Sequence, residues 1–265
     1  MPLFPPLNPP LPAWPDARVW VIGASTGIGA ATARALLAAG ARVALSARSD
    51  DKLREVAGAS AIANGNAVIE PLDFTQGAEV AAAGDRVRAA WGGCDLVLVV
   101  AGTHQEIRAW ELTEANARAL LEINLNGPIA TIAVVLPSLL AQCHGAIGVV
   151  SSVAGYRGLP KALVYGASKA ALINFTETLY LDLHPKGLGV YLINPGFVAT
   201  PLTAKNAFRM PALITAEQAA AATLAGLRAG RFEIHYPRRF TSVLKLLRLL
   251  PYRAYFALIH RITGP

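Results

Sequence analysis

The stretch VWVIGASTGIGAATARALLAAG, residues 19–40, predicts the class of fold. It opens on a continuous apolar run, which is typical of a strand covered on both faces. Three glycines follow in the pattern G-x3-G-x-G, at Gly23, Gly27 and Gly29, and the alanine- and leucine-rich run after them predicts a helix. Glycines let the backbone turn sharply and approach a pyrophosphate, and the first turn of a helix offers unpaired N–H groups. The stretch therefore predicts a strand–turn–helix unit that binds a nucleotide.

Strand and helix patterns go on alternating to about residue 237. Apolar runs predict strands at 18–24, 41–47, 67–73, 94–102, 145–152, 189–196 and 232–237. Helical patterns lie between them, at 27–39, 50–63, 75–91, 111–140, 162–184 and 215–229. This alternation indicates βαβ units, so we predict a Rossmann-like α/β fold with a doubly wound parallel sheet and helices on both faces. In such sheets a ligand binds beyond the carboxyl ends of the strands.

Length and composition fit one large domain with two short extensions. The chain has 265 residues, of which 54% are hydrophobic and 15% charged, so it can bury a large core. We expect a proline-rich extended arm at 1–17, a Rossmann-type domain at 18–238 and a basic amphipathic tail at 239–265. From Arg231 onward seven Lys and Arg accompany a single Glu, so +6 of the net charge of +7 belongs to the end of the chain.

Several kinds of site and location are not expected. The two cysteines, Cys94 and Cys143, form no disulfide framework and fit no metal spacing, so we predict inert core or near-core thiols, no metal site and a reducing, cytoplasmic location. The N-terminus lacks the basic region of a secretory signal. No run of 18 apolar residues occurs, so a membrane-spanning helix is not expected. The basic charge has no nucleic-acid recognition motif beside it, so nucleic acid is not expected as a partner.

Motifs after later strands join the glycine turn in a pattern that resembles the short-chain dehydrogenase/reductase family. They are Asp73, Ala101-Gly102, YGASK at 165–169 and NPGFVAT at 194–200. The resemblance covers about residues 18–237 and implies a nicotinamide cofactor and redox chemistry between a carbonyl and an alcohol. Two positions depart from the family's pattern: Ile22 stands where a Thr is usual, and Val99-Val100 stands where a pair of Asn is usual. These departures concern the bracing of the sheet more than the chemistry.

The resemblance also implies which residues contact the cofactor. They are Gly23, Ser25, Thr26, Gly27, Ile28, Gly29, Arg48, Asp73, Phe74, Ala101, Gly102, Tyr165, Lys169, Pro195, Gly196, Val198 and Thr200. An acidic residue at Ala47 would pair with a ribose 2′-hydroxyl, whereas Arg48 could hold a 2′-phosphate. We therefore expect NADP(H) in preference to NAD(H). Two observations weaken this expectation: Arg48 could pair instead with a nearby aspartate, and Thr26 lies where many NADP-dependent relatives carry a basic residue.

The segment YGASK supplies the expected acid/base chemistry. Tyr165 and Lys169 are four residues apart and therefore lie on one face of a helix. A free tyrosine has a pKa of about 10, and a neighbouring ammonium would stabilise its phenolate and lower that value. The resemblance adds Ser152, which would hold the substrate oxygen, and Asn124, which would interrupt a helix and hold a water leading to Lys169. We expect hydride transfer at a carbonyl carbon, with Tyr165 exchanging the proton.

The substrate side and the tail leave more than one interpretation open. His104, expected as a solvated loop residue, would contribute to the pocket wall together with 153–159 and 200–213, whose apolar residues favour an apolar substrate. The tail at 240–262 has the pattern of a helix at a membrane surface, but a subunit contact or a lid would look the same. A homodimer or homotetramer is expected through the helices at 111–140 and 162–184. The alternatives to an enzyme are a non-catalytic nucleotide-binding regulator or scaffold, and a membrane-associated protein whose tail carries the main function.

Overall fold

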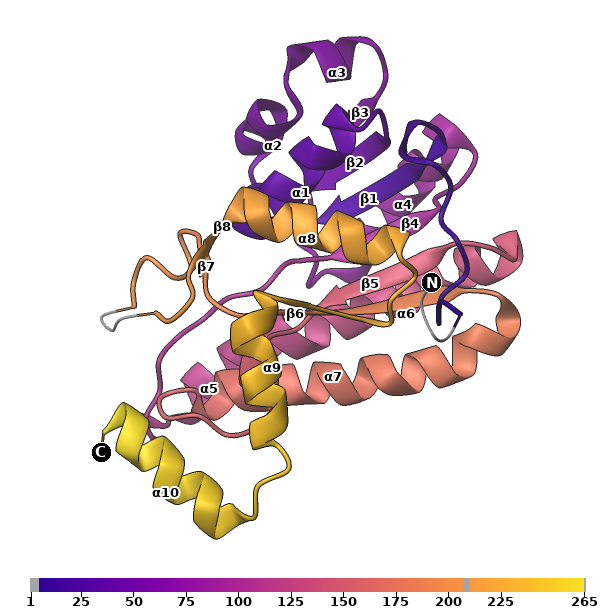
Figure 1. Ribbon diagram of the computed structural model, residues 1–265. Coiled ribbons are helices and arrows are strands. Elements are labelled where there is room, and N and C mark those ends of the chain that lie inside the picture. The colour runs from indigo at the N-terminus through magenta and orange to yellow at the C-terminus, as the bar shows by residue number, and fades with distance from the viewer. Residues whose placement is uncertain (1–4, 207–209, 265) are drawn as a thin grey trace.

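A seven-stranded parallel sheet forms the centre of the computed structural model, which describes residues 5–206 and 210–264 (Figure 1). The strand order is β3-β2-β1-β4-β5-β6-β9, which confirms the doubly wound α/β prediction. The strands are β1 (Arg18–Ile22), β2 (Arg42–Ser46), β3 (Ala67–Ile69), β4 (Leu96–Val99), β5 (Ala146–Val150), β6 (Gly189–Pro195) and β9 (Glu233–Tyr236). From β1 the chain adds β2 and β3 on one side and then returns to add β4 on the other, so the strand order reverses between β1 and β4. Ligands bind at such a switch point in open α/β sheets.

Helices cover both faces of the sheet and bury two separate cores. Val19 and Val21 of β1 belong to one core, and Trp20 and Ile22 belong to the other, as the alternation of side chains along a strand requires. The helices of the first face are α1 (Gly27–Ala38), α2 (Asp50–Ala57), α3 (Ala59–Ala63) and α8 (Ala216–Arg228). Those of the second face are α4 (Gly77–Trp91), α6 (Gly127–Gln142) and α7 (Leu163–Leu183), and α5 (Glu114–Leu121) packs on α7. This double burial explains the nearly continuous apolar strands.

One helix that the sequence predicts as continuous is interrupted, a second has an interruption at the expected place, and one small sheet is new. The run at 50–63 breaks at Gly58, whose φ of 77° lies outside the helical region. The run at 111–140 contains a π-helical turn at Glu122–Asn126, between α5 and α6. Strands β7 (Val198–Ala199) and β8 (Ile214–Thr215) form a two-residue pairing that flanks the expected substrate segment at 200–213. Strands this short have no periodicity that a sequence pattern could reveal.

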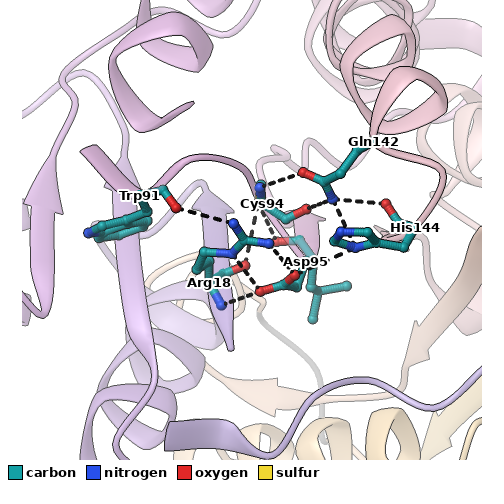
Figure 2. Close-up of polar contacts among 7 residues, drawn as sticks. Arg18, Trp91, Cys94, Asp95, Gln142 and His144 are labelled. Atoms are coloured by element: carbon teal, nitrogen blue, oxygen red, sulfur yellow. Dashed lines mark hydrogen bonds and ion pairs between the residues drawn. The ribbon is translucent and has the colours of Figure 1, made fainter. Parts of the chain in front are cut away.

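A polar cluster ties the amino ends of β1 and β4 together, away from the carboxyl ends where a ligand would bind (Figure 2). The Arg18 guanidinium donates to both carboxylate oxygens of Asp95, at 2.9 and 2.7 Å, and to the Trp91 carbonyl at 3.1 Å. Gln142, at the end of α6, donates to the Cys94 carbonyl at 2.8 Å. Burial raises the pKa of the Cys94 thiol to about 12, so this thiol is inert. Cys143, in contrast, is exposed at the end of α6, and its expected near-core position is wrong.

Both extensions are attached to the domain. Residues 5–13 of the arm form no helix or strand, and a short 3-10 helix follows at Trp14–Asp16. The side-chain amide of Asn8 bonds to both the N–H and the C=O of Val190, each at 2.8 Å, and so attaches the arm to β6. The tail forms two helices, α9 (Arg238–Leu247) and α10 (Tyr252–Thr263), drawn in yellow at the edge of the molecule (Figure 1). Residues 240 and 244 of α9 pack against Val153 and Tyr156.

One helical run is long and apolar enough to cross a membrane by length and composition. It is Glu114–Gln142, which spans α5, the π-helical turn and α6. In this fold the run belongs to the helical layer over the sheet, because α6 packs on α4 and α5 packs on α7.

Candidate active site

The glycine turn between β1 and α1 is packed so tightly that two of its glycines cannot be replaced without a collision. A Cβ at Gly23, where φ is 94°, would lie 2.5 Å from the backbone nitrogen of Ala101. A Cβ at Gly29 would lie 2.1 Å from the Gly23 carbonyl oxygen. The N–H groups of Gly23 and Ala24 donate to the Ser46 carbonyl, at 2.7 and 3.0 Å, and so fix the turn to β2. The backbone itself therefore forms this wall of the site.

A cleft of about 720 Å³ opens beyond the carboxyl ends of the strands, next to this turn. It has the size of a cofactor or ligand site. All of the residues that the sequence assigns to the cofactor line this one cleft: Gly23, Ser25, Thr26, Gly27, Ile28, Gly29, Arg48, Asp73, Phe74, Ala101, Gly102, Tyr165, Lys169, Pro195, Gly196, Val198 and Thr200. Ser152 lines it as well, whereas Asn124 lies just behind the wall and is fully buried. Residues 207–209 of the expected substrate segment lie outside the described residues.

Two basic side chains line the end of the cleft beside β2, Arg48 and Lys52 of α2. An adjoining cavity of about 310 Å³ has mixed charge, because Glu55 and Glu217 line it together with Lys52 and Arg34. Hydrogen bonds from the Thr75 N–H and hydroxyl lower the pKa of Asp73, and the charge of Arg48 lowers it further. Lys52 was not among the expected cofactor residues, although its position in the first turn of the helix that follows Arg48 was an available signal.

Tyr165 and Lys169 project from the first turns of α7 into the same cleft. The Lys169 side chain is buried, and its Nζ donates to the Val150 carbonyl at 3.1 Å and lies 5.9 Å from the centroid of the Tyr165 ring. Burial lowers the pKa of Lys169 to about 8. Burial also raises the pKa of Tyr165, and a hydrogen bond with Ser152 opposes that rise. In the chain without cofactor the pKa of Tyr165 thus moves upward through burial, opposite to the lowering expected from Lys169.

The two serines after β5 have different partners. The Ser152 hydroxyl oxygen accepts a hydrogen bond from the Ala154 N–H at 3.1 Å, which leaves its proton available toward the cleft. The Ser151 hydroxyl instead donates to the Lys169 carbonyl at 2.7 Å and braces α7. Of the two, Ser152 is therefore the serine whose hydroxyl lies against Tyr165.

Asn124 lies in the π-helical turn, as the expected helix interruption requires. Its amide donates to the Thr103 carbonyl and its carboxamide oxygen accepts from the Thr103 N–H, both at 2.8 Å. A Cβ at Gly102 would lie 3.4 Å from the Asn124 side-chain oxygen and 3.5 Å from Lys169 Nζ, so both polar atoms lie close to this glycine. Asn124 thus positions the loop after β4 next to Lys169.

His104 differs from expectation. Its ring packs edge-on against Tyr165 with the ring centroids 4.6 Å apart, and burial lowers its pKa. It is therefore a half-buried loop residue beside Tyr165, and it is not among the residues that line the cleft.

Comparison with known proteins agrees with this geometry. The family model of short chain dehydrogenases matches residues 17–210. The chain belongs to this family. An uncharacterized oxidoreductase of Myxococcus xanthus is 34% identical over 247 residues, which cover 91% of this chain and 96% of that protein. An uncharacterized oxidoreductase of Staphylococcus saprophyticus is 35% identical over 197 residues, covering 71% of this chain and 81% of its own length.

Solved structures of short-chain dehydrogenases and related enzymes share the fold. A short-chain dehydrogenase from Streptomyces avermitilis superposes with a TM-score of 0.78 at 27% identity, covering 93% of this chain and 97% of that one. The structure of an actinorhodin polyketide ketoreductase with NADPH superposes with a TM-score of 0.75 at 25% identity, covering 84% and 96%. The chain is thus an oxidoreductase of a family that binds nicotinamide cofactors, and the glycine turn, which has no room for a Cβ at Gly23 or Gly29, fits such a group.

The two departures from the family's pattern prove to be neighbours. Ile22 of β1 stands opposite Val99 of β4 in the register of the sheet, and both side chains are buried in the same core. Where the family's pattern has polar residues on both strands, this chain therefore has two apolar side chains in one core, so neither strand buries a polar group opposite an apolar one.

Proposed function

We propose that this short-chain dehydrogenase is a carbonyl reductase or alcohol dehydrogenase that prefers NADP(H) and acts on an apolar substrate. The observation that carries the proposal is the presence of Ser152, Tyr165 and Lys169 on one cleft with the glycine turn. A nucleotide-binding regulator would have no need for a phenol, a free hydroxyl and a buried ammonium at the same cleft.

In the proposed mechanism a bound nicotinamide supplies or accepts the hydride at the substrate carbon. The Tyr165 hydroxyl gives its proton to the substrate oxygen during reduction and takes it back during oxidation. Ser152 donates a hydrogen bond to that oxygen and aligns it with the phenol. Lys169, held by the Val150 carbonyl, provides the positive charge that favours the phenolate once the proton has left. Asn124 keeps the loop after β4 against Lys169.

The basic end of the cleft supports the preference for NADP(H). Arg48 and Lys52 both line it, and Ala47 leaves no carboxylate to repel a 2′-phosphate. The similar polyketide ketoreductase is a structure with NADPH, which agrees with this choice.

Apolar residues on the open side of the cleft support an apolar substrate. Ala119, Ile123 and Leu202 line it there.

We further propose that the protein is a homodimer or homotetramer that associates through α5–α6 and α7. The exposed Leu140, Leu163 and Leu181 on these helices support this proposal. We also propose a cytoplasmic location.

The test is a screen of NADPH and NADH oxidation with acyl, steroid-like and small aliphatic ketones, preceded by a fluorescence titration of each cofactor. Turnover of at least one apolar ketone with NADPH is expected. Tight NADPH binding with no turnover of any ketone or alcohol would instead favour a nucleotide-binding regulator.

A further inference from the structure

The two C-terminal helices carry a row of apolar side chains that no other described part of the chain covers. We call this set the tail surface; it consists of Val243, Leu246, Leu249, Tyr252, Phe256 and Ile262, each between 53% and 81% exposed. The first three follow at intervals of three residues and lie on one side of α9 and its exit. The rings of Tyr252 and Phe256 are stacked, 5.6 Å between centroids. Soluble monomers rarely expose so many large apolar groups together, and such patches mark interaction sites.

The opposite side of α9 is firmly attached to the domain. Lys245 forms an ion pair with Glu233 of β9, and the buried Thr241 hydroxyl bonds to His235 at 2.6 Å. The side chains of Phe240 and Leu244 complete this inner side against the loop after Ser152. The outward direction of the tail surface is therefore fixed by contacts on the other side of the helix.

Arg157 fixes the connection between the two helices. Its guanidinium donates to the carbonyls of Leu247 and Leu250, at 2.8 and 2.7 Å, and lies 4.0 Å from the centroid of the Tyr255 ring. The Tyr255 hydroxyl in turn donates to the Gly158 carbonyl at 2.7 Å. Because these contacts hold α10 at the edge of the molecule (Figure 1), the helix does not fold back to bury its apolar side.

Charge decides between the possible occupants of this surface. Arg238, Arg239, Arg253 and Arg261 are exposed, and no ion pair among the described residues includes any of them. The sequence has no Asp or Glu after Glu233. A second copy of this face would bring arginines against arginines with no acidic partner, which is unfavourable. A surface of anionic phospholipids offers both complementary charge and an apolar interior.

We propose that the tail surface docks on an anionic phospholipid bilayer, with its apolar side chains at the acyl boundary and the four arginines among the headgroups. The loop at 153–158 contacts both tail helices, so docking places the residues that follow Ser152 next to the membrane. The proposal rests on α9 and α10 and is independent of the redox chemistry.

The test is co-sedimentation of the full-length protein with vesicles of phosphatidylcholine alone and of phosphatidylcholine mixed with phosphatidylglycerol. We expect binding to the mixed vesicles to be at least about tenfold tighter and to weaken with added salt. The variant Leu246→Glu/Leu249→Glu/Phe256→Glu should lose at least about tenfold in affinity. The control Ala81→Glu/Ala82→Glu/Ala89→Glu adds the same three charges to exposed positions of α4 and should bind as the parent does.

Three outcomes would overturn the proposal. One is an absence of parent binding to the mixed vesicles, and another is equal binding by the tail variant and the parent. The third is a loss of binding by the α4 control equal to that of the tail variant. In that case the change in net charge alone would explain the weaker vesicle binding. Size-exclusion chromatography with light scattering on the same variants would detect a second copy on this surface, since the tail variant would then dissociate. NADPH binding by each variant reports separately on the folded domain.

Discussion

The Lys169 ammonium donates to the Val150 carbonyl at 3.1 Å, inside a site where its side chain has almost no contact with solvent. A single neutral carbonyl does not replace the hydration of an ammonium, which is why burial lowers the pKa of Lys169 to about 8. The cation that the proposed mechanism requires is therefore held at a cost to the stability of the folded protein.

Replacing Lys169 by Met should stabilise the protein without cofactor at neutral pH and abolish catalysis. Protonated lysine is disfavoured in the folded state below pH 8, so the gain in the free energy of unfolding should be largest there, about 1–3 kcal/mol. Between pH 8 and about 10.4 the folded protein has already released the proton that the unfolded chain retains, so the gain should shrink as pH rises. Urea unfolding at several pH values measures it; a gain that grows toward pH 10 would contradict the cause given.

Replacing Tyr165 by Phe should reduce kcat by about 10²–10⁴-fold, because the variant lacks the proton donor. The affinity for NADPH should change little, since the ring and its contact with His104 remain. Steady-state kinetics with the best ketone of the screen, and NADPH fluorescence titration, check both statements. Ser151→Ala serves as the control, because that hydroxyl braces α7 and its loss should lower stability more than kcat.

Replacing Arg48 and Lys52 by Gln should weaken NADPH binding by at least about tenfold and leave NADH binding within about twofold, because only NADPH carries the 2′-phosphate. Isothermal titration of both cofactors against the single and double variants measures this. Equal losses for the two cofactors would mean that the basic end of the cleft holds the shared pyrophosphate instead.

Replacing Asp95 by Asn should lower the free energy of unfolding at pH 7 by about 2–4 kcal/mol, because Arg18 would lose its partner at the amino edge of the sheet (Figure 2). Burial by itself would raise the pKa of Asp95, but the hydrogen bonds and charge of Arg18 outweigh it and lower the pKa. The stabilisation is thus complete above the unfolded pKa of about 3.9 and is lost as pH falls through the lower folded value.

Urea unfolding at acid pH tests this explanation. The difference between parent and Asp95→Asn in urea unfolding should narrow below about pH 4. NADPH binding at pH 7 should be unchanged, since this cluster lies at the amino ends of the strands.

The sheet, the cleft and its lining residues could be predicted from the sequence, because each strand and the motif that follows it form a local pattern. In a parallel sheet the carboxyl ends of the strands lie at one edge, so the motifs that follow them lie close together. Pro195 ends β6, Gly196 follows it, and Asp73 lies in the segment after β3, yet all three line the same cleft as the glycine turn. Features that depend on packing were missed. His104 has no local signature for its contact with Tyr165, and the raised pKa of Tyr165 follows from burial by neighbours that are distant in the sequence.

Glu233 is a junction for three parts of the chain. Its carboxylate accepts from the Tyr156 hydroxyl at 2.5 Å and from the Asn194 amide at 2.9 Å, and it pairs with Lys245 of α9. Tyr156 follows Ser152 closely, and Asn194 immediately precedes the Pro195-Gly196 wall of the cleft. A substitution at Lys245 would leave the Glu233 carboxylate with the Tyr156 hydroxyl and the Asn194 amide as its partners, so a change on the outer helix α9 reaches residues that directly adjoin the cleft.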